Sequence, residues 1–371
     1  MNFDFSDEQR ELQRSARRLL EEQCPTKKLR TLFEGDEDFD RRLWSTLAEM
    51  GFCGAAIPEE YGGLGLGYLE LCVIAEELGR ALAPVPFDST IGLFSEILKL
   101  AGSDEQKSKY LPAVAQGKLI GTLAYLESQA VAPRLISSTV IGGELSGIKC
   151  PVMDGRCADA AIVVACEEQD TSPTLFLVEL GSSGVQRHSV QTVDPSRKHA
   201  RLTFQGAPAE RLGPRGDGLE ILGHAFDRAA VLVAFQQAGG AERALYMARD
   251  YALQRIAFGR PIGSFQAIKH MLADMFVSLT LARANAYYAA WALQSASAEL
   301  PIAAAAARVS ATAAFQHCTS NNIQVHGGIG VTWEFDAHLF YRRSNLLALS
   351  LGSQSQWEAK LIDRMRLRSA A

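Results

Sequence analysis

The chain has 371 residues, of which 47% are hydrophobic and 21% are charged, a composition that is ordinary for a globular protein. The formal net charge is −5 and no block of basic residues stands out, so we expect no nucleic-acid partner. The polar, acidic start MNFDFSDEQREL predicts no secretory signal, and no apolar run approaches the roughly 20 residues that span a bilayer, so we expect no membrane span.

The first third of the sequence predicts helices. Ser6 followed by Gln9 is a capping-box signature that opens a helix through about Glu22. Four further helices are expected, at 38–50, after the loop 62–67, at 88–101 and at 103–116. We therefore predict an N-terminal helical domain over 1–120.

The glycine-rich loop YGGLGLG at 61–67 invites a dinucleotide-binding interpretation. No strand is predicted before it, so a phosphate-binding turn between a strand and a helix has no scaffold. We expect these glycines only to turn the chain between two helices.

The pattern changes between about 121 and 213, where glycine-rich turn signals separate short apolar runs. Three of these runs predict strands: AAIVVA at 160–165, TLFLVE at 174–179 and RLTF at 201–204. We expect a small β domain over 121–216, built as a barrel or a sandwich.

Helices return after this β domain. Four long, alanine-rich, amphipathic runs are predicted at 218–256, 264–297, 300–324 and 335–350. Pro301 suits the first turn of the third of these helices. The fold class is therefore mainly α with a central β domain, and 217–371 is expected to form a four-helix bundle.

The seven cysteines are odd in number and scattered, and none forms a CxxC pair. This pattern indicates reduced thiols in a cytoplasmic protein and not a disulfide framework or a zinc site. We expect no metal centre.

Four motifs in this α–β–α order carry a family resemblance: IPEEYGGLGLG, GELSGIK followed by CADAAIVVA, RIAFGRPIGSFQ, and QVHGGIGVTWEFDAHLFYRR. With them the chain resembles the acyl-CoA dehydrogenase family over almost its whole length. The wording HGGIGVTWEFDAHL is similar to a bacterial branch that acts on bulky acyl-CoA substrates, including steroid side chains.

The resemblance implies a reaction and a cofactor. Members remove a proton from Cα of an acyl-CoA thioester while Cβ gives a hydride to the flavin of FAD, which an electron-transfer flavoprotein then reoxidises. A carboxylate beside Cα acts as the general base. The FAD site is shared between two chains, because one subunit holds the flavin ring and its neighbour contributes to the adenine–pyrophosphate end.

The part that a subunit gives to its neighbour, here called the donated half, is present. Arg255 matches the family arginine that grips the neighbour's pyrophosphate, and a guanidinium suits that task because its fork binds two oxygens. Alternatively, Arg255 forms a surface salt bridge and Gly327-Gly328 only stop a helix. The resemblance implies cofactor contact at Arg255, Phe258, Phe265, Gln266, Gln324, His326, Gly327 and Gly328.

The part that holds the flavin ring, here called the receiving half, departs from the family pattern. A TEP…GSD-like segment is replaced by YLESQAVAP (125–133), in which Glu127 survives and the threonine position reads Leu126. In the WIT-like segment, Pro151 stands at the tryptophan position and Met153 at the threonine position. Neither can replace the aromatic stack or the hydroxyl.

The general base is also missing from the family positions. The more common position reads Leu351, and the second, on the first bundle helix, reads Ala229, with Ala230 in place of an arginine. Asp227 is the nearest carboxylate, but two residues along a helix turn it about 200° away. We interpret Asp227 as a solvated or helix-terminal charge.

We therefore predict the non-catalytic subunit of a heteromeric (α2β2) acyl-CoA dehydrogenase, whose partner is a second, related chain that carries the catalytic glutamate and with which it shares FAD. Two alternatives stay open. One is a homotetrameric enzyme with an unusual base, such as Asp227. The other is a flavin-free scaffold or binding protein that keeps only the fold.

Overall fold

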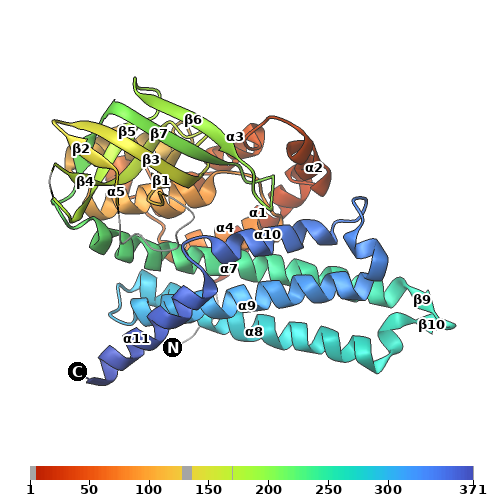
Figure 1. Ribbon diagram of the computed structural model, residues 1–371. Helices are drawn as coiled ribbons and strands as arrows, with labels where there is room; N and C mark the ends of the chain where they lie inside the picture. Colours follow the sequence, from red (N-terminus) through yellow and green to blue (C-terminus); the bar gives the residue numbers. More distant parts are fainter. Residues whose placement is uncertain (1–5, 128–135, 169, 371) are drawn as a thin grey trace. The chain divides into compact units, whose positions relative to one another are not determined.

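The computed structural model describes residues 6–127, 136–168 and 170–370 (Figure 1). They form two compact units, each made of segments that are distant in the sequence. The helical unit comprises Met1–Lys28, Tyr68–Ala83 and Ala230–Ala371, and the sheet unit comprises Leu29–Gly67 and Pro84–Ala229. The expected domain limits at 120 and 216 stay a prediction.

Long helices build the helical unit: α1 (Asp7–Gln23), α4 (Tyr68–Arg80), most of α7 (Gly218–Gln254), α8 (Gln266–Gln294), α9 (Leu300–His326), α10 (Ala337–Leu349) and α11 (Gln354–Ala370). Helix α9 packs against α8, α10 and α11, and Figure 1 shows α7, α8 and α9 side by side. The four predicted bundle helices are confirmed. The fifth, α11, was not predicted.

Local sequence signals fix several helix ends as expected. The hydroxyl of Ser6 accepts from the backbone N–H of Gln9 at 3.2 Å, and the Gln9 side chain accepts from the Ser6 N–H at 3.0 Å, which confirms the capping box. Pro301 lies in the first turn of α9. Gly327 ends that helix with a φ of +64°, a left-handed conformation that favours glycine.

Helices α4 and α7 pack backbone against backbone through glycines. A Cβ on Gly239 of α7 would lie 2.0 Å from the carbonyl oxygen of Glu76, and one on Gly79 of α4 would lie 2.1 Å from that of Gln236. No other residue fits at such a contact.

An ion-pair network joins α1, α4, α7 and α8 inside the helical unit. Its shortest contacts are Arg17–Glu77 at 2.7 Å, Arg80–Glu242 at 2.6 Å, Arg283–Glu76 at 2.5 Å and Arg283–Glu242 at 2.9 Å. Glu76 and Glu77 are almost fully buried. Three arginines balance three glutamates, as buried charges require.

The sheet unit combines short helices with a single mixed sheet. Its helices are α2 (Thr26–Glu34), α3 (Arg41–Glu49), η1 (Phe52–Gly54), η2 (Glu59–Tyr61), the π-helix η3 (Asp88–Phe94), α5 (Ser95–Ala101) and α6 (Asp104–Ala115). All but α2 and the short η1 and η2 follow the predicted helical ranges. Its strands are β1 (Gly121–Ala124), β2 (Thr139–Ile141), β3 (Glu144–Met153), β4 (Ala160–Glu167), β5 (Pro173–Glu179), β6 (Val185–Val190), β7 (His199–Pro208) and β8 (Glu210–Leu212).

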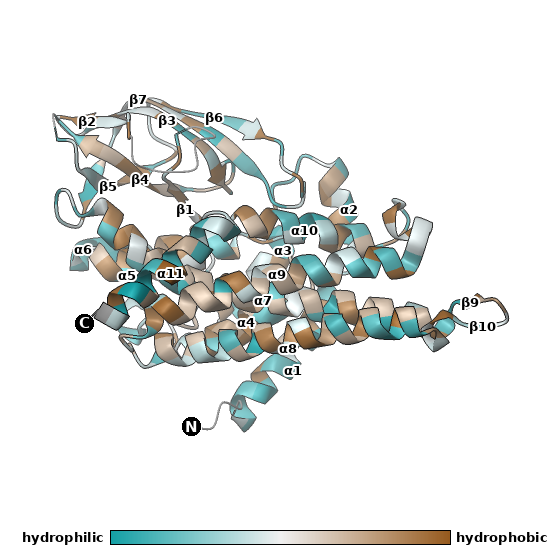
Figure 2. Ribbon diagram, turned by 60° about the horizontal axis from the view of Figure 1, so that its bottom comes forward, coloured by the Kyte–Doolittle hydropathy of each residue, from teal (hydrophilic) through white to brown (hydrophobic). Residues whose placement is uncertain are grey.

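The sheet has the order β6-β7-β3-β2-β4-β5-β8, with β1 added in parallel to β4. The strands do not close into a barrel over the described residues. We expected a barrel or a sandwich, and the structure instead has one open mixed sheet. Strand β4 is buried along almost its whole length, and Figure 2 shows it as hydrophobic, whereas β6 is largely hydrophilic. The three predicted strands are confirmed as β4, β5 and part of β7.

The glycine-rich loop at 62–67 turns the chain, as predicted. The backbone N–H groups of Leu64, Gly65 and Leu66 donate to carbonyl oxygens of 54–57 at 2.8–3.0 Å. These donors are therefore committed and form no phosphate nest.

Candidate functional site

The stretch that follows α7 forms a small hairpin at the end of the bundle (Figure 1). Strands β9 (Ile256–Ala257) and β10 (Arg260–Pro261) pair antiparallel around a two-residue turn, Phe258-Gly259. Both turn residues have positive φ, +54° and +76°, as a primed hairpin turn requires. The turn presents Phe258 with its side chain 94% exposed.

Arg255 is held by its backbone and leaves its guanidinium available. Its N–H donates to the carbonyl of Tyr251 at 2.8 Å, and its carbonyl accepts from the N–H of Ile262 at 2.8 Å. The side chain is exposed and makes no ion pair with any residue that the structure describes. The alternative of a surface salt bridge therefore has no partner within those residues.

Phe265 and Gln266 lie at the start of α8. Phe265 is the N-cap residue and its side chain cannot cap, so the first N–H groups of this long helix stay open, and Gln266 is exposed. The Phe265 ring lies 6.2 Å from that of Phe258, edge to face, and carries the guanidinium of Arg260 at 4.1 Å.

The second motif ends α9. Gln324 is exposed, as are Gly327 and Gly328, and a Cβ on either glycine would meet nothing within 4 Å. The backbone of this turn is thus open to close approach from outside.

His326 differs from the other predicted contacts because its side chain is buried. Its Nδ1 lies 2.7 Å from the carbonyl oxygen of Asn322, and burial lowers its pKa. The ring packs against those of Tyr251, at 4.2 Å, and Phe335, at 4.4 Å, and these two rings also meet each other edge to face at 6.3 Å. These two aromatic residues, missed by sequence reasoning, bring the Arg255 and Gly327 segments together. Phe335 lies inside the second motif and Tyr251 lies just before the first, and neither residue carries a further signal of its own.

The donated half fits the diphosphate end of a dinucleotide. It offers an unpaired guanidinium, the uncapped N-terminus of α8, an exposed aromatic ring and open glycine backbone.

In the receiving half, local contacts occupy Glu127. Its carboxylate accepts from Lys149 Nζ at 2.6 Å and from the backbone N–H groups of Ser137 and Ser138 at 2.6 and 2.9 Å. Burial raises its pKa, but these hydrogen bonds outweigh burial and lower it to about 2. The rest of the 125–133 segment, from 128 onward, lies outside the described residues.

The WIT-like segment is closed by a buried arginine. The Sδ of Met153 accepts from Arg197 Nη2 at 3.4 Å, and Arg197 also pairs with Asp88 at 2.9 Å and Asp154 at 3.5 Å. Pro151 is exposed and follows a cis peptide bond. This half offers neither an aromatic cover nor a hydroxyl at those positions, and it does not fit a flavin ring.

The family base positions hold buried apolar side chains. Leu351 is 6% exposed in the turn between α10 and α11, and its carbonyl accepts from the Trp357 indole N–H at 3.1 Å. Ala229 and Ala230 are almost fully buried in α7. No carboxylate stands at any of these three positions.

Asp227 corrects one expectation. Its side chain is only 4% exposed, so the interpretation as a solvated charge is wrong. Helical periodicity places Asp227 on the face of α7 opposite Ala229. Both residues are buried within the sheet unit, so the two faces of the helix are covered there.

All seven cysteines are free, and the described residues contain no group of His, Cys, Asp and Glu that could hold a metal ion. No helix in the described ranges is long and apolar enough to cross a membrane.

Comparison with known proteins identifies the family. Residues 6–118 match the acyl-CoA dehydrogenase N-terminal domain and residues 216–362 match the acyl-CoA dehydrogenase C-terminal domain. The chain is 35% identical over 318 residues to the acyl-CoA dehydrogenase IpdE2 of Mycobacterium tuberculosis, covering 85% of this chain and 84% of that protein. The chain belongs to the acyl-CoA dehydrogenase family, whose members are FAD-dependent oxidoreductases.

The solved structures that resemble this chain include members of the steroid-related branch of the family. A variant of the steroid ACAD Tcur3481-Tcur3483 is 30% identical with a TM-score of 0.89, covering 98% of this chain and 99% of that one. The ChsE4-ChsE5 complex from Mycobacterium tuberculosis is 27% identical, with a TM-score of 0.89 and 99% coverage of both chains. An acyl-CoA dehydrogenase complexed with FAD from Bacillus anthracis is 25% identical with a TM-score of 0.92, covering 99% of this chain and 68% of that one.

Proposed function

We propose that this chain is the non-catalytic subunit of a heteromeric acyl-CoA dehydrogenase and completes the FAD site of a second chain. One contrast carries the proposal. The exposed guanidinium of Arg255 has no protein partner among the described residues, whereas the base position holds the buried Leu351.

The donated half supports the proposal because its groups match the needs of a diphosphate. Arg255 would grip two phosphate oxygens through its fork, and the open N–H groups at the start of α8 would add a positive helix end. Phe258 would lie against the adenosine, and the Gly327-Gly328 backbone would allow close approach. FAD supplies the hydride acceptor of the reaction when it is bound.

The receiving half supports the proposal that the flavin ring and the general base belong to the second chain. Lys149 and the backbone of Ser137 and Ser138 use the acceptors of Glu127, and Arg197 uses the sulfur of Met153. These donors and acceptors serve the sheet unit itself, so none of these described groups is free to bind a flavin ring. Loss of a positioned general base costs roughly 10²–10⁴ in rate.

The partner in this proposal is a second acyl-CoA dehydrogenase-like chain that carries the catalytic glutamate and an intact flavin-ring segment. The substrate is a bulky acyl-CoA such as a steroid side-chain ester, a choice supported by the similarity to the steroid ACAD Tcur3481-Tcur3483. An electron-transfer flavoprotein accepts the electrons. Seven free cysteines support a reducing, cytoplasmic location.

The proposal is tested by measuring FAD per chain. The chain purified alone should carry little or no flavin and no acyl-CoA dehydrogenase activity. Co-expression with a related chain that has the glutamate should give a complex with bound FAD and activity. A yellow, active homo-oligomer of this chain alone would contradict the proposal.

The burial of Asp227 gives one rival function specific support: a homotetrameric enzyme that uses Asp227 as its base. Asp227→Asn should then abolish turnover by the chain alone, while Asp217→Asn, at an exposed position just before the same helix, should leave turnover unchanged. Our proposal expects no turnover by the chain alone in any of the three forms.

A further inference from the structure

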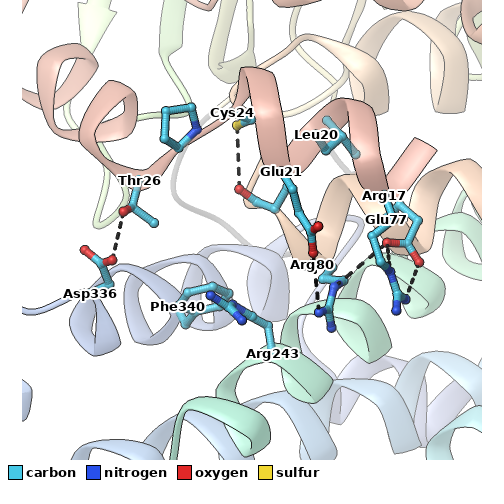
Figure 3. Close-up of a pocket in the computed structure, with 12 residues that line it drawn as sticks. Arg17, Leu20, Glu21, Cys24, Thr26, Glu77, Arg80, Arg243, Asp336 and Phe340 are labelled. Atoms are coloured by element: carbon cyan, nitrogen blue, oxygen red, sulfur yellow. Dashed lines mark hydrogen bonds and ion pairs between the residues drawn. The ribbon is translucent and has the colours of Figure 1, made fainter. Parts of the chain in front are cut away.

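A cavity of about 300 Å³ lies wholly within the helical unit, and no predicted cofactor-binding residue lines it (Figure 3). Helices α1, α4, α7 and α10 contribute its walls. Its apolar wall is formed by Leu20, Cys24, Ala81 and Phe340. A cavity of this size lies at the small end of ligand sites, so it suits a small molecule.

Arg80 brings unused donors to this cavity. Its side chain is 13% exposed, and Nη1 donates to Glu242 at 2.6 Å. Its Nη2 and Nε lie 4.0 Å from Glu21 and from Glu77, beyond hydrogen-bond distance. Neither nitrogen is a buried atom without a partner, and Arg80 lines the cavity, so these N–H groups are available to a ligand there.

Arg243 is a second cation at the same cavity. It projects from α7 and makes no hydrogen bond, ion pair or ring contact with any described residue. Figure 3 shows Arg243 and Arg80 among the side chains that line this cavity. Two guanidinium groups from different helices thus face one space that has an apolar wall.

Most of the other charged groups around the cavity already form hydrogen bonds or ion pairs within the protein. Arg17 binds Glu77 through two nitrogens at 2.7 and 2.9 Å. Asp336 accepts from the hydroxyl of Thr26 at 2.8 Å. Glu21 differs, because its side chain is 66% exposed and its nearest oxygen stays 4.0 Å from Arg80. It is a loosely held anion at the mouth of the cavity.

We propose that this cavity binds a small organic carboxylate. Its carboxylate would lie between Arg80 and Arg243, because a guanidinium fork pairs with two oxygens of one carboxylate. Its short apolar body would lie against Leu20 and Phe340. Glu21 competes for Arg80 until the ligand displaces it.

The test is a calorimetric titration of the full-length chain with hexanoate, and with hexanamide, acetate and inorganic phosphate as comparison ligands. Hexanoate should bind saturably at one site per chain. Hexanamide should bind at least about 10-fold more weakly because it lacks the charge. Acetate should also bind more weakly because it lacks the apolar body.

Variants separate the cavity from non-specific binding. Arg243→Ala should weaken hexanoate about 10-fold or more, and Arg243→Lys should weaken it less. Glu21→Gln should strengthen binding by about 3-fold, because it removes the competing charge. Arg249→Ala is the matched control, since Arg249 lies on the same helix but pairs with Asp250 at 2.7 Å.

Three results would overturn the proposal: no saturable binding of hexanoate, unchanged affinity in Arg243→Ala, or phosphate binding as tightly as hexanoate. A change in affinity that Arg249→Ala shares equally would also overturn it. Flavin content plays no part in this test, so its outcome is independent of the proposed function.

Discussion

The imidazole of His326 lies 4.2 Å from the ring of Tyr251, measured between centroids, and so joins the last turn of α9 to the last turn of α7. Phe335 lies 4.4 Å from the same imidazole and 6.3 Å from Tyr251, so the three rings form one cluster. The two segments proposed to contact the cofactor are thereby held against each other by a residue whose own side chain is buried. His326 is a positioning residue in this account.

His326→Ala should destabilise the helical unit by about 2 kcal/mol, because it leaves a cavity beside the rings of Tyr251 and Phe335. Urea unfolding measures this change. His317→Ala, an exposed position on the same helix, should change stability by less than about 0.5 kcal/mol. Equal losses in the two variants would contradict the assigned position of His326.

Gly239→Ala should prevent α4 and α7 from packing at their present distance, since the new Cβ would lie 2.0 Å from the Glu76 carbonyl oxygen. We expect a loss of about 3 kcal/mol or failure to accumulate folded chain. Gly223→Ala lies on the same helix with nothing within 4 Å of its Cβ. It should be neutral or stabilise by up to about 1 kcal/mol. Thermal unfolding of the two variants makes the comparison.

The Glu127–Lys149 pair predicts acid sensitivity. The pKa of Glu127 falls from 4.5 to about 2 on folding, so its contribution to stability is complete above 4.5 and is lost as the pH falls toward 2. Glu127→Gln leaves the buried Lys149 without this partner and should cost about 3 kcal/mol at neutral pH.

The stability difference between the native chain and Glu127→Gln should therefore shrink as the pH falls below 4.5. Urea unfolding at a series of pH values tests this, with Glu144→Gln as an exposed control on β3, the strand that carries Lys149. A difference that is constant with pH would contradict the assigned ionisation.

Leu351→Glu should not make the chain an enzyme on its own. The side chain at this position is buried, and Pro151 and Met153 supply neither the aromatic ring nor the hydroxyl expected beside a flavin, so a carboxylate alone should restore neither geometry nor cofactor. Acyl-CoA dehydrogenase activity of the isolated variant should stay at background. Turnover above that level would show that only the base was missing.

Some of the fold follows from local signals that the sequence carries openly. The capping box of Ser6 and Gln9 predicts a helix N-terminus, and Phe258-Gly259 marks the break between α7 and α8. These features depend on neighbours within a few residues, so spacing alone predicts them. Helix α11 carries the same start signal as α1, since Ser353 and Gln356 form the reciprocal hydrogen bonds of a capping box at 2.8 and 3.4 Å, and that signal was overlooked. Helix α2 has no comparable start signal.

Site residues could be predicted from the sequence only where they lie within a family motif. Arg255 stands in such a motif, but its lack of a partner is a fact of three-dimensional surroundings. Arg197 binds Asp88 from 109 positions away along the chain, and no periodicity links the two. Asp227 shows the same limit, because a helical period gives the face of a residue but not what covers it.

The central claim is that Arg255 serves the flavin of another chain, and the most direct test is FAD retention by the heteromeric complex. After gel filtration, a complex with Arg255→Ala should bind FAD at least about 10-fold more weakly than the native complex, because charge-assisted hydrogen bonds to phosphate are lost. The Arg249→Ala complex should match the native one. Unchanged FAD affinity in the Arg255→Ala complex would contradict the account and favour a flavin-free scaffold.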